Sequence, residues 1–276
     1  MTRMEILAKL RRTRASGQPI IGAGIGLGLV AKCAEAGGID LIVLYNAGRY
    51  RMAGRGSMAG LMPYGDANAI AMDLASEVMP VVKKTPVLAG VCGTDPFRQM
   101  PLLLAELKSI GFVGVQNYPT VGILDGVIRQ NIEETGMGFD REVEVIRIAH
   151  EMDLVTCSNV FNEVEAKAMV EAGADILVPH VGVTSSGHVG AKTIVSLDAA
   201  AARIQSMLEA AKAVRDDVLV LCHGGPVAEP SDVAYVMAKV RELDGFFGGS
   251  SIDRLPAERA ITEQVRRFKA IVRTNP

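Results

Sequence analysis

Tryptophan is absent from this chain, and aromatic residues make up only 4% of its 276 positions, so a core must rest on aliphatic side chains. The four cysteines are widely scattered without a C-x-x-C pair, which fits a reduced, cytoplasmic setting best. The net charge is only −2 and no basic tract occurs, so we expect no nucleic-acid partner. No apolar run approaches about 18 residues, and the charged N-terminal segment lacks the apolar region of a signal peptide, so we expect no membrane partner.

What the chain does contain is a repeated alternation of apolar runs and helical patterns. Hydrophobic residues make up 49% of the sequence, enough for a large core. Several runs are continuously apolar, as in parallel strands that are buried on both faces, and helical periodicity follows them. The predicted strands span residues 19–26, 40–47, 86–93, 112–118, 154–160, 175–181, 218–223 and 245–248.

Eight strand–helix repeats predict a single α/β domain over residues 1–276, a (β/α)8 TIM barrel with a short N-terminal helix. An open doubly wound sheet is the alternative, but the alternating glycines of the first strand fit no G-x-G-x-x-G frame. Three connections that follow strands, 48–65, 119–138 and 182–196, are long and glycine-rich. Loops of that length are usually functional, so we expect the site on the C-terminal face of the barrel, with 182–196 as a lid or anion loop.

Two glycine-rich turns follow the last two predicted strands. Barrels of this class commonly bind a phosphate at these two turns, because glycine lets backbone N–H groups approach an anion. We therefore predict that the turns bind the phosphate or carboxylate of a small anionic substrate. The residues concerned are Gly224, Gly225, Gly249 and Ser250.

Histidines end two neighbouring predicted strands, His180 the sixth and His223 the seventh. Each could be a hydrogen-bonded structural residue, but two at adjacent C-terminal ends favour at least one general acid or base. Asp95, after the third strand, is a candidate catalytic carboxylate or a helix N-cap with Pro96 at the first helical position. Glu163 could act as a base, join His180 at a metal, or only complement a helix dipole. The spacing of these residues matches no recognised metal signature, so the metal ligands stay unknown.

Neutral amides are predicted at the ends of strands two, four and five, where they could orient a carboxylate or enolate, or satisfy backbone groups. They are Asn46, Gln116, Asn117 and Asn159. Gly22 and Gly24 would let a ligand approach the first strand, unless they only serve tight barrel packing. The arginines at 49, 51 and 55 could neutralise an anion or form a solvated cluster. No lysine falls in a predicted strand, which disfavours Schiff-base chemistry.

Taken together, several strand-end motifs resemble those of the phosphoenolpyruvate hydrolase-like TIM-barrel family over nearly the whole chain. The motifs are IGAGIG (21–26), LYNAGR (44–49), GVCGTDP (90–96), GVQNYPT (114–120), PHVG (179–182) and the two glycine turns. The resemblance implies one barrel, assembly into homo-oligomers, and a distant relation to the phosphoenolpyruvate mutase group. That group binds Mg²⁺ through an Asp-x-Asp motif and carries a Lys-Lys-Cys-Gly loop, and this chain has neither. The family is also similar to a barrel of a plant antiviral resistance protein, which acts by binding a viral protein.

The leading hypothesis is a hydrolase or lyase that acts on a small 2-oxo acid or its phosphorylated or phosphono form. A divalent metal such as Mg²⁺ is the cofactor that the resemblance implies. One alternative is an FMN-dependent oxidoreductase, because flavin barrels use similar turns after strands seven and eight. Another is a barrel that binds a ligand or a protein without turnover.

Overall fold

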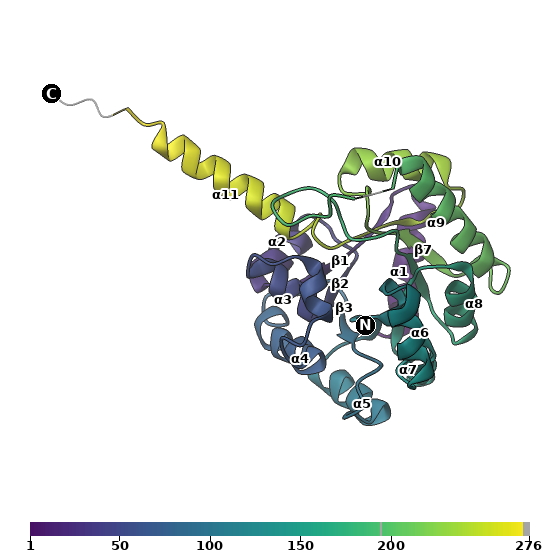
Figure 1. The fold of residues 1–276 in the computed structure, drawn as a ribbon. Helices are drawn as coiled ribbons and strands as arrows, with labels where there is room; N and C mark the ends of the chain where they lie inside the picture. Colours follow the sequence, from purple (N-terminus) through teal and green to yellow (C-terminus); the bar gives the residue numbers. More distant parts are fainter. Residues whose placement is uncertain (194, 273–276) are drawn as a thin grey trace.

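Eight parallel strands close into a barrel in this computed structural model, which describes residues 1–193 and 195–272. The strands pair in sequence order, and β1 pairs with β8 to complete the ring (Figure 1). All eight predicted runs contain a strand, which confirms the (β/α)8 fold. The strands are β1 (Ile20–Ile25), β2 (Leu41–Leu44), β3 (Val87–Val91), β4 (Gly114–Asn117), β5 (Val155–Val160), β6 (Ile176–Pro179), β7 (Leu219–Cys222) and β8 (Gly245–Gly248).

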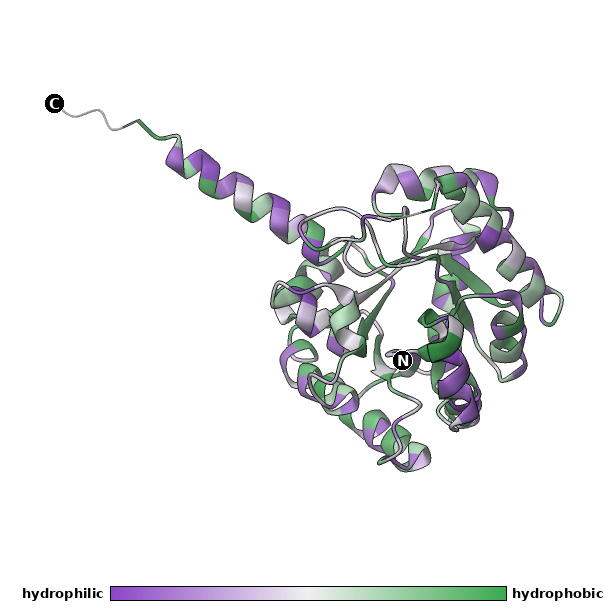
Figure 2. Ribbon diagram, viewed as in Figure 1, coloured by the Kyte–Doolittle hydropathy of each residue, from purple (hydrophilic) through white to green (hydrophobic). Residues whose placement is uncertain are grey.

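Helices surround the barrel and cover the outward-facing side chains of the strands. In Figure 2 the barrel strands are mostly hydrophobic and the outer helices alternate between hydrophobic and hydrophilic residues. Side chains cap two of these helices at their N-termini, because Asp66 accepts the Ala69 N–H and Asn162 accepts the Glu165 N–H, each at 2.9 Å. The helices around the barrel are α2 (Gly28–Ala36), α4 (Ala67–Val78), α5 (Met100–Ile110), α7 (Phe139–Glu151), α8 (Glu163–Glu171), α9 (Leu197–Lys212) and α10 (Pro230–Lys239). A further helix, α11 (Arg254–Lys269), follows β8.

The N-terminal helix α1 (Arg3–Ala15) lies across the N-terminal end of the barrel. Its buried Ile6 and Leu10 pack with Ile20 and the other inward-facing strand residues. Ion pairs at this end tie the helix to the starts of two strands, from Arg3 to Asp175 and from Arg14 to Asp244. This end of the barrel is therefore closed, and the C-terminal end is the one that can hold a site.

Two of the long segments that follow strands contain helices that the sequence pattern did not predict. The segment 48–65 was expected to be a loop and Asn46 to end a strand, but β2 ends at Leu44 and α3 (Asn46–Met52) follows, with a 3-10 turn at Ser57–Leu61. The segment 119–138 contains a 3-10 turn (Val121–Ile123) and α6 (Gly126–Glu134). The helix after β3 begins at Met100, so the expectation that Asp95 caps it is wrong.

Helix α11 begins against the barrel and then projects away from it (Figure 1). Arg254 and Leu255 in its first turn are buried, whereas the apolar side chains Ile261, Val265 and Phe268 are all more than half exposed. Within residues 1–193 and 195–272, no helix combines the length and the apolar character that a bilayer crossing requires.

Candidate active site

His180 and His223 lie side by side at the C-terminal mouth of the barrel. The two residues form a parallel β-bridge just beyond β6 and β7, and their ring centroids are 4.5 Å apart at an interplanar angle of 76°. The Gly182 N–H donates to His180 Nδ1 at 3.1 Å, so a neutral His180 carries its proton on Nε2. The contact between His223 Nδ1 and the Phe247 carbonyl is 2.6 Å, and a carbonyl can only accept, so His223 carries its proton on Nδ1.

The two imidazoles therefore present opposite chemistry at their Nε2 atoms. His180 offers an N–H donor, and His223 offers a lone pair. Burial lowers the pKa of His180 well below its ordinary value, and the nearby His223 lowers it further. Burial also lowers the pKa of His223 to about 4, although the bond to the Phe247 carbonyl opposes this. Both rings are consequently neutral at pH 7, a state in which His180 can donate a hydrogen bond and His223 can accept a proton.

Arg51 brings a buried positive charge to the same mouth. It comes from α3, its side chain is only 2% exposed, and its guanidinium pairs with the fully buried Asp253 at 2.6 Å. Burial alone would lower the pKa of Arg51, but Asp253 raises it above its ordinary value, so the group stays charged. Its Nη2 also donates to the Gly24 carbonyl at 2.7 Å. Within the described residues Nη1 has no hydrogen-bond partner, and it lies beside Gly249.

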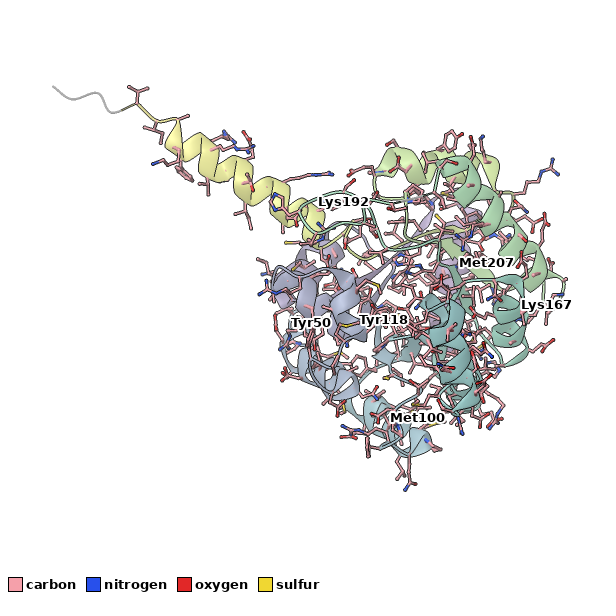
Figure 3. All side chains as sticks on the ribbon, viewed as in Figure 1. Tyr50, Met100, Tyr118, Lys167, Lys192 and Met207 are labelled. Carbon is pink, nitrogen blue, oxygen red and sulfur yellow. The ribbon has the colours of Figure 1, made fainter. Side chains whose placement is uncertain are left out.

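Two tyrosines fill the centre of the mouth beneath these groups. Tyr45 and Tyr118 pack with ring centroids 4.5 Å apart, and Figure 3 shows Tyr118 near the middle of the barrel, unlike Tyr50 at its periphery. A Cβ added at Gly24 would lie 1.8 Å from Tyr45 Oη, and one at Gly22 would lie 2.8 Å from the Phe247 ring. The space above both glycines is therefore occupied by protein, so the expectation that Gly22 and Gly24 receive a ligand is wrong. They permit tight packing instead.

The two glycine turns contribute unequally to the mouth. The Gly225 N–H already donates to the Gly182 carbonyl at 2.7 Å, and Gly224 packs so closely that a Cβ would lie 2.2 Å from the same oxygen. The turn after β7 is thus joined to the loop after β6, and the Gly225 N–H is not available to an anion. Gly249 and Ser250, in contrast, line a small cavity of about 20 Å³ together with both histidines, Arg51, Tyr45, Tyr118 and Ser57.

The predicted amides all form hydrogen bonds within the protein, although Asn46 Oδ1 is buried without a partner among the described residues. Asn117 and Asn159 bond reciprocally between β4 and β5, since Asn117 Oδ1 accepts the Asn159 N–H at 2.6 Å and Asn159 Nδ2 donates to the Asn117 carbonyl at 3.2 Å. Gln116 donates to the thiol sulfur of Cys157 inside the barrel at 3.3 Å. Asn46 donates to the Gly60 carbonyl at 2.8 Å and lines a different cavity. None of the four lines the cavity that holds the histidine pair.

Both predicted carboxylates lie away from the histidines. The Glu163 side chain is at the outer surface, where it accepts a hydrogen bond from Ser206 on α9. Asp95 accepts the Phe97 N–H at 2.9 Å and a hydrogen bond from Asn68 at 3.1 Å, and it lines a cavity between the loops after β2, β3 and β4. The structure therefore brings together His180, His223, Gly249 and Ser250, and leaves Asp95 and Glu163 apart from them.

The donor set at the mouth does not fit a divalent metal. Among residues 1–193 and 195–272, no three His, Cys, Asp or Glu side chains come close enough together to hold a metal ion. Asp253 is the acidic residue beside this mouth, and its carboxylate is already bound by Arg51 and by the Arg254 N–H. Tyr45 and Tyr118, which also line the mouth, supply no carboxylate.

A closed parallel barrel with a polar mouth at its C-terminal end defines a (β/α)8-barrel protein. The chain belongs to the phosphoenolpyruvate hydrolase-like family, whose model matches residues 5–271. Two tomato (Solanum lycopersicum) proteins, the ToMV susceptible protein tm-1(GCR26) and the ToMV resistance protein Tm-1(GCR237), are each 56% identical to it over 269 residues. These matches cover 98% of this chain but only 36% of each tomato protein, so the chain spans about a third of their length.

Solved structures share the fold at low sequence identity. A phosphonopyruvate hydrolase in complex with oxalate and Mg²⁺ has a TM-score of 0.58 and 17% identity, with 100% of this chain and 90% of that chain covered. A dimethylmalate lyase of the phosphoenolpyruvate mutase and isocitrate lyase superfamily has a TM-score of 0.56 and 18% identity, with coverages of 98% and 92%. These two structures give the FMN alternative no support.

Proposed function

We propose that the barrel mouth catalyses proton transfer during bond cleavage in a small 2-oxo acid or its phosphorylated or phosphono form. The observation that carries the proposal is the pair of neutral histidines with opposite free Nε2 groups, beside the buried Arg51. The family and the reported structural neighbours favour hydrolysis or lyase chemistry on such substrates. The pair itself suits either reaction, because both need one proton removed and one oxygen protonated or hydrogen-bonded.

Each group has a distinct role in this proposal. His223 Nε2 takes a proton from water or from the carbon acid, and the neutral His180 Nε2–H donates to the oxygen on which negative charge develops. Arg51 Nη1 and the Ser250 hydroxyl hold the substrate carboxylate or phosphate. Asp253 binds the guanidinium through Nε and Nη2, so Nη1 still has hydrogens to donate to a substrate. Asp253 is therefore a positioning residue.

Substrate entry requires the loops above the mouth to move. The small cavity of about 20 Å³ has room for about one water molecule. Ile123 from the loop after β4 and Val183 and Thr184 from the loop after β6 close it. His180 also borders a neighbouring cavity of about 610 Å³, so displacement of Ile123, which lines both, would join the two spaces. We propose that these loops act as the lid.

Release of pyruvate from phosphoenolpyruvate and from phosphonopyruvate, with and without Mg²⁺, Mn²⁺ or Co²⁺, tests the proposal. We expect turnover that falls by about a hundredfold or more in His223→Gln and His180→Gln. His150→Gln, on α7 beside Arg3 at the N-terminal end of the barrel, is the matched control and should retain full activity. Turnover that both mutants keep would overturn the proposed roles, and ligand-induced stabilisation of the wild-type protein without product would favour a binding barrel.

A further inference from the structure

A separate cavity of about 590 Å³, the one that Asn46 and Asp95 line, opens beside the mouth between the loops after β2, β3 and β4. Its volume lies within the range of about 300–1,000 Å³ that is typical of small-molecule sites. The segment 119–124 separates it from the mouth, because Pro119, Thr120 and Val121 line this cavity whereas Tyr118 and Ile123 line the small cavity with the histidines. Neither histidine nor Arg51 contributes to its walls.

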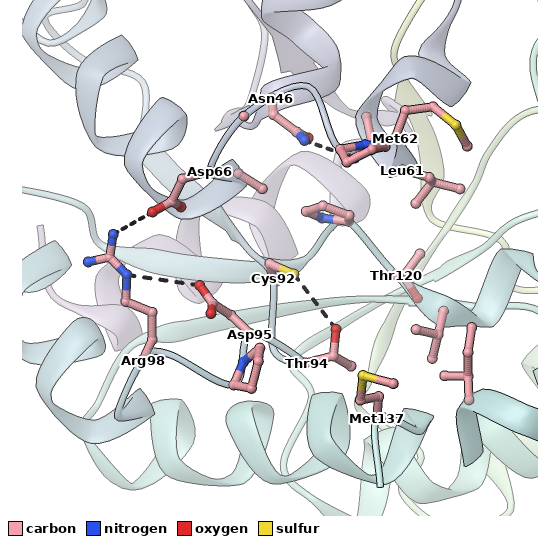
Figure 4. Close-up of a pocket in the computed structure, with 18 of the residues that line it drawn as sticks. Asn46, Leu61, Met62, Asp66, Cys92, Thr94, Asp95, Arg98, Thr120 and Met137 are labelled. Atoms are coloured by element: carbon pink, nitrogen blue, oxygen red, sulfur yellow. Dashed lines mark hydrogen bonds and ion pairs between the residues drawn. The ribbon is translucent and has the colours of Figure 1, made fainter. Parts of the chain in front are cut away.

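The walls of this cavity are amphipathic. Figure 4 shows Leu61, Met62 and Met137 gathered toward one side and Asp66, Asp95 and Arg98 toward the other. The apolar side also includes Val121, Leu124 and Ile132. Methionine side chains adapt to irregular apolar shapes, and Met62 and Met137 are each more than two-fifths exposed although they adjoin the cavity. Such a wall is suited to the hydrocarbon part of a ligand.

The polar side carries two carboxylates and one cation. Arg98 pairs with Asp66 at 2.7 Å and lies 3.9 Å from Asp95, so a net negative charge remains. The Asp95 carboxylate is only 16% exposed and retains free lone pairs beyond its two hydrogen bonds. Burial raises the pKa of the nearby Cys92 thiol, so this group stays neutral and adds no charge. This cavity therefore carries a net negative charge, whereas the charge of Arg51 at the mouth is balanced by that of Asp253.

We propose that this cavity is a separate binding site for a small apolar molecule with a cationic or hydroxyl head, the head lying against Asp95 and the hydrocarbon against Met62 and Met137. An anionic head is disfavoured, because it would face Asp66 and Asp95 with no unpaired cation to compensate. The 2-oxo acid substrate of the mouth is thus excluded from it. This inference does not depend on the proposed catalysis.

Three probes of the same size and different charge test the site: phenylbutylamine, phenylbutanol and phenylbutyrate. Binding is measured by calorimetry and by protection of Cys92 from iodoacetamide in the 276-residue protein with Cys33→Ser, in which Cys157 and Cys222 are buried. We expect the amine and the alcohol to protect Cys92, and the amine to bind at least fivefold more tightly than the carboxylate. Failure of all three to protect Cys92, or equal protection by the carboxylate, would overturn the proposal.

Asp95→Asn tests the head group directly. The variant keeps an oxygen for the Phe97 N–H and removes the charge, so the preference for the amine over the alcohol should fall about fivefold, which corresponds to about 1 kcal/mol. Asp73→Asn is the matched control, since Asp73 lies on α4 with an exposed carboxylate that does not line the cavity. Equal loss in both variants, or no loss in Asp95→Asn, would contradict the placement of the head.

Discussion

Gly24→Ala should destabilise the barrel strongly, because the mouth is filled by protein at this position. The added Cβ would lie 1.8 Å from Tyr45 Oη and 2.1 Å from Cζ, whereas ordinary contacts begin at 3.4 Å. Tyr45 cannot give way easily, since it is buried, stacks on Tyr118 and lies under the Arg51 guanidinium at 5.4 Å. Overpacking of this kind costs about 3 kcal/mol. At about 2–4 °C per kcal/mol, Tm should fall by roughly 6–12 °C.

Gly249→Ala is the matched control for this substitution. A Cβ there would lie 3.6 Å from both Tyr45 Oη and Arg51 Nη1, which is ordinary contact with the same two neighbours. We expect Gly249→Ala to change the free energy of unfolding by less than about 1 kcal/mol. Urea unfolding followed by circular dichroism measures both variants.

The double variant Gly24→Ala/Tyr45→Ala identifies the clash. Tyr45→Ala alone removes a buried aromatic ring and should cost about 3–5 kcal/mol. With the ring absent, the new methyl group has space, so the double variant should be no less stable than Tyr45→Ala alone. Additive losses, or a Gly24→Ala protein that unfolds at the wild-type urea concentration, would refute the packing role of Gly24.

Three further predictions follow from the buried charges and the exposed helix. Asp253→Ala leaves the Arg51 guanidinium buried without its carboxylate and should cost about 3–5 kcal/mol by urea unfolding, whereas Arg51→Met/Asp253→Leu should recover most of that loss. His223 has a pKa of about 4 when folded and about 6.5 when unfolded, so the unfolded chain binds more protons between these values. The free energy of unfolding of the wild type should therefore fall as the pH drops from about 6.5 to about 4. His223 contributes up to about 1.4 kcal/mol of this fall per pH unit. Urea titrations at several pH values should show a weaker pH dependence for His223→Gln. The homo-oligomer that the family resemblance implies stays a prediction, and the exposed apolar face of α11 is the candidate interface. Light scattering should show a lower mass for Val265→Glu/Phe268→Glu than for the wild type. An unchanged mass would exclude this face from assembly.

The sequence allowed the strands and the histidine pair to be predicted, because both depend on local pattern. Continuously apolar runs indicate buried parallel strands, and the ends of neighbouring strands must meet at one face of a barrel, which places His180 beside His223. Gly249 and Ser250 reach the mouth for the same reason.

The remaining features depend on contacts between distant segments. Arg51 was one of three arginines that could neutralise an anion, but it could not be singled out, since α3 was not recognised and its partner Asp253 is 202 residues away. Gly24 was expected to admit a ligand, but the residue that fills the space above it, Tyr45, comes from the end of the next strand. Glu163 follows a strand, yet as the first residue of α8 its side chain extends to Ser206 on the neighbouring helix.

Exchange of the methyl protons of pyruvate for deuterium, followed by proton NMR in D₂O, tests the central claim most directly, because it reports removal of a proton from the carbon of a 2-oxo acid. The account predicts exchange at neutral pH by the wild-type protein and by His150→Gln, and a loss of about a hundredfold or more in His223→Gln. An absence of exchange by the folded wild-type protein, or an equal rate in His223→Gln, would contradict it.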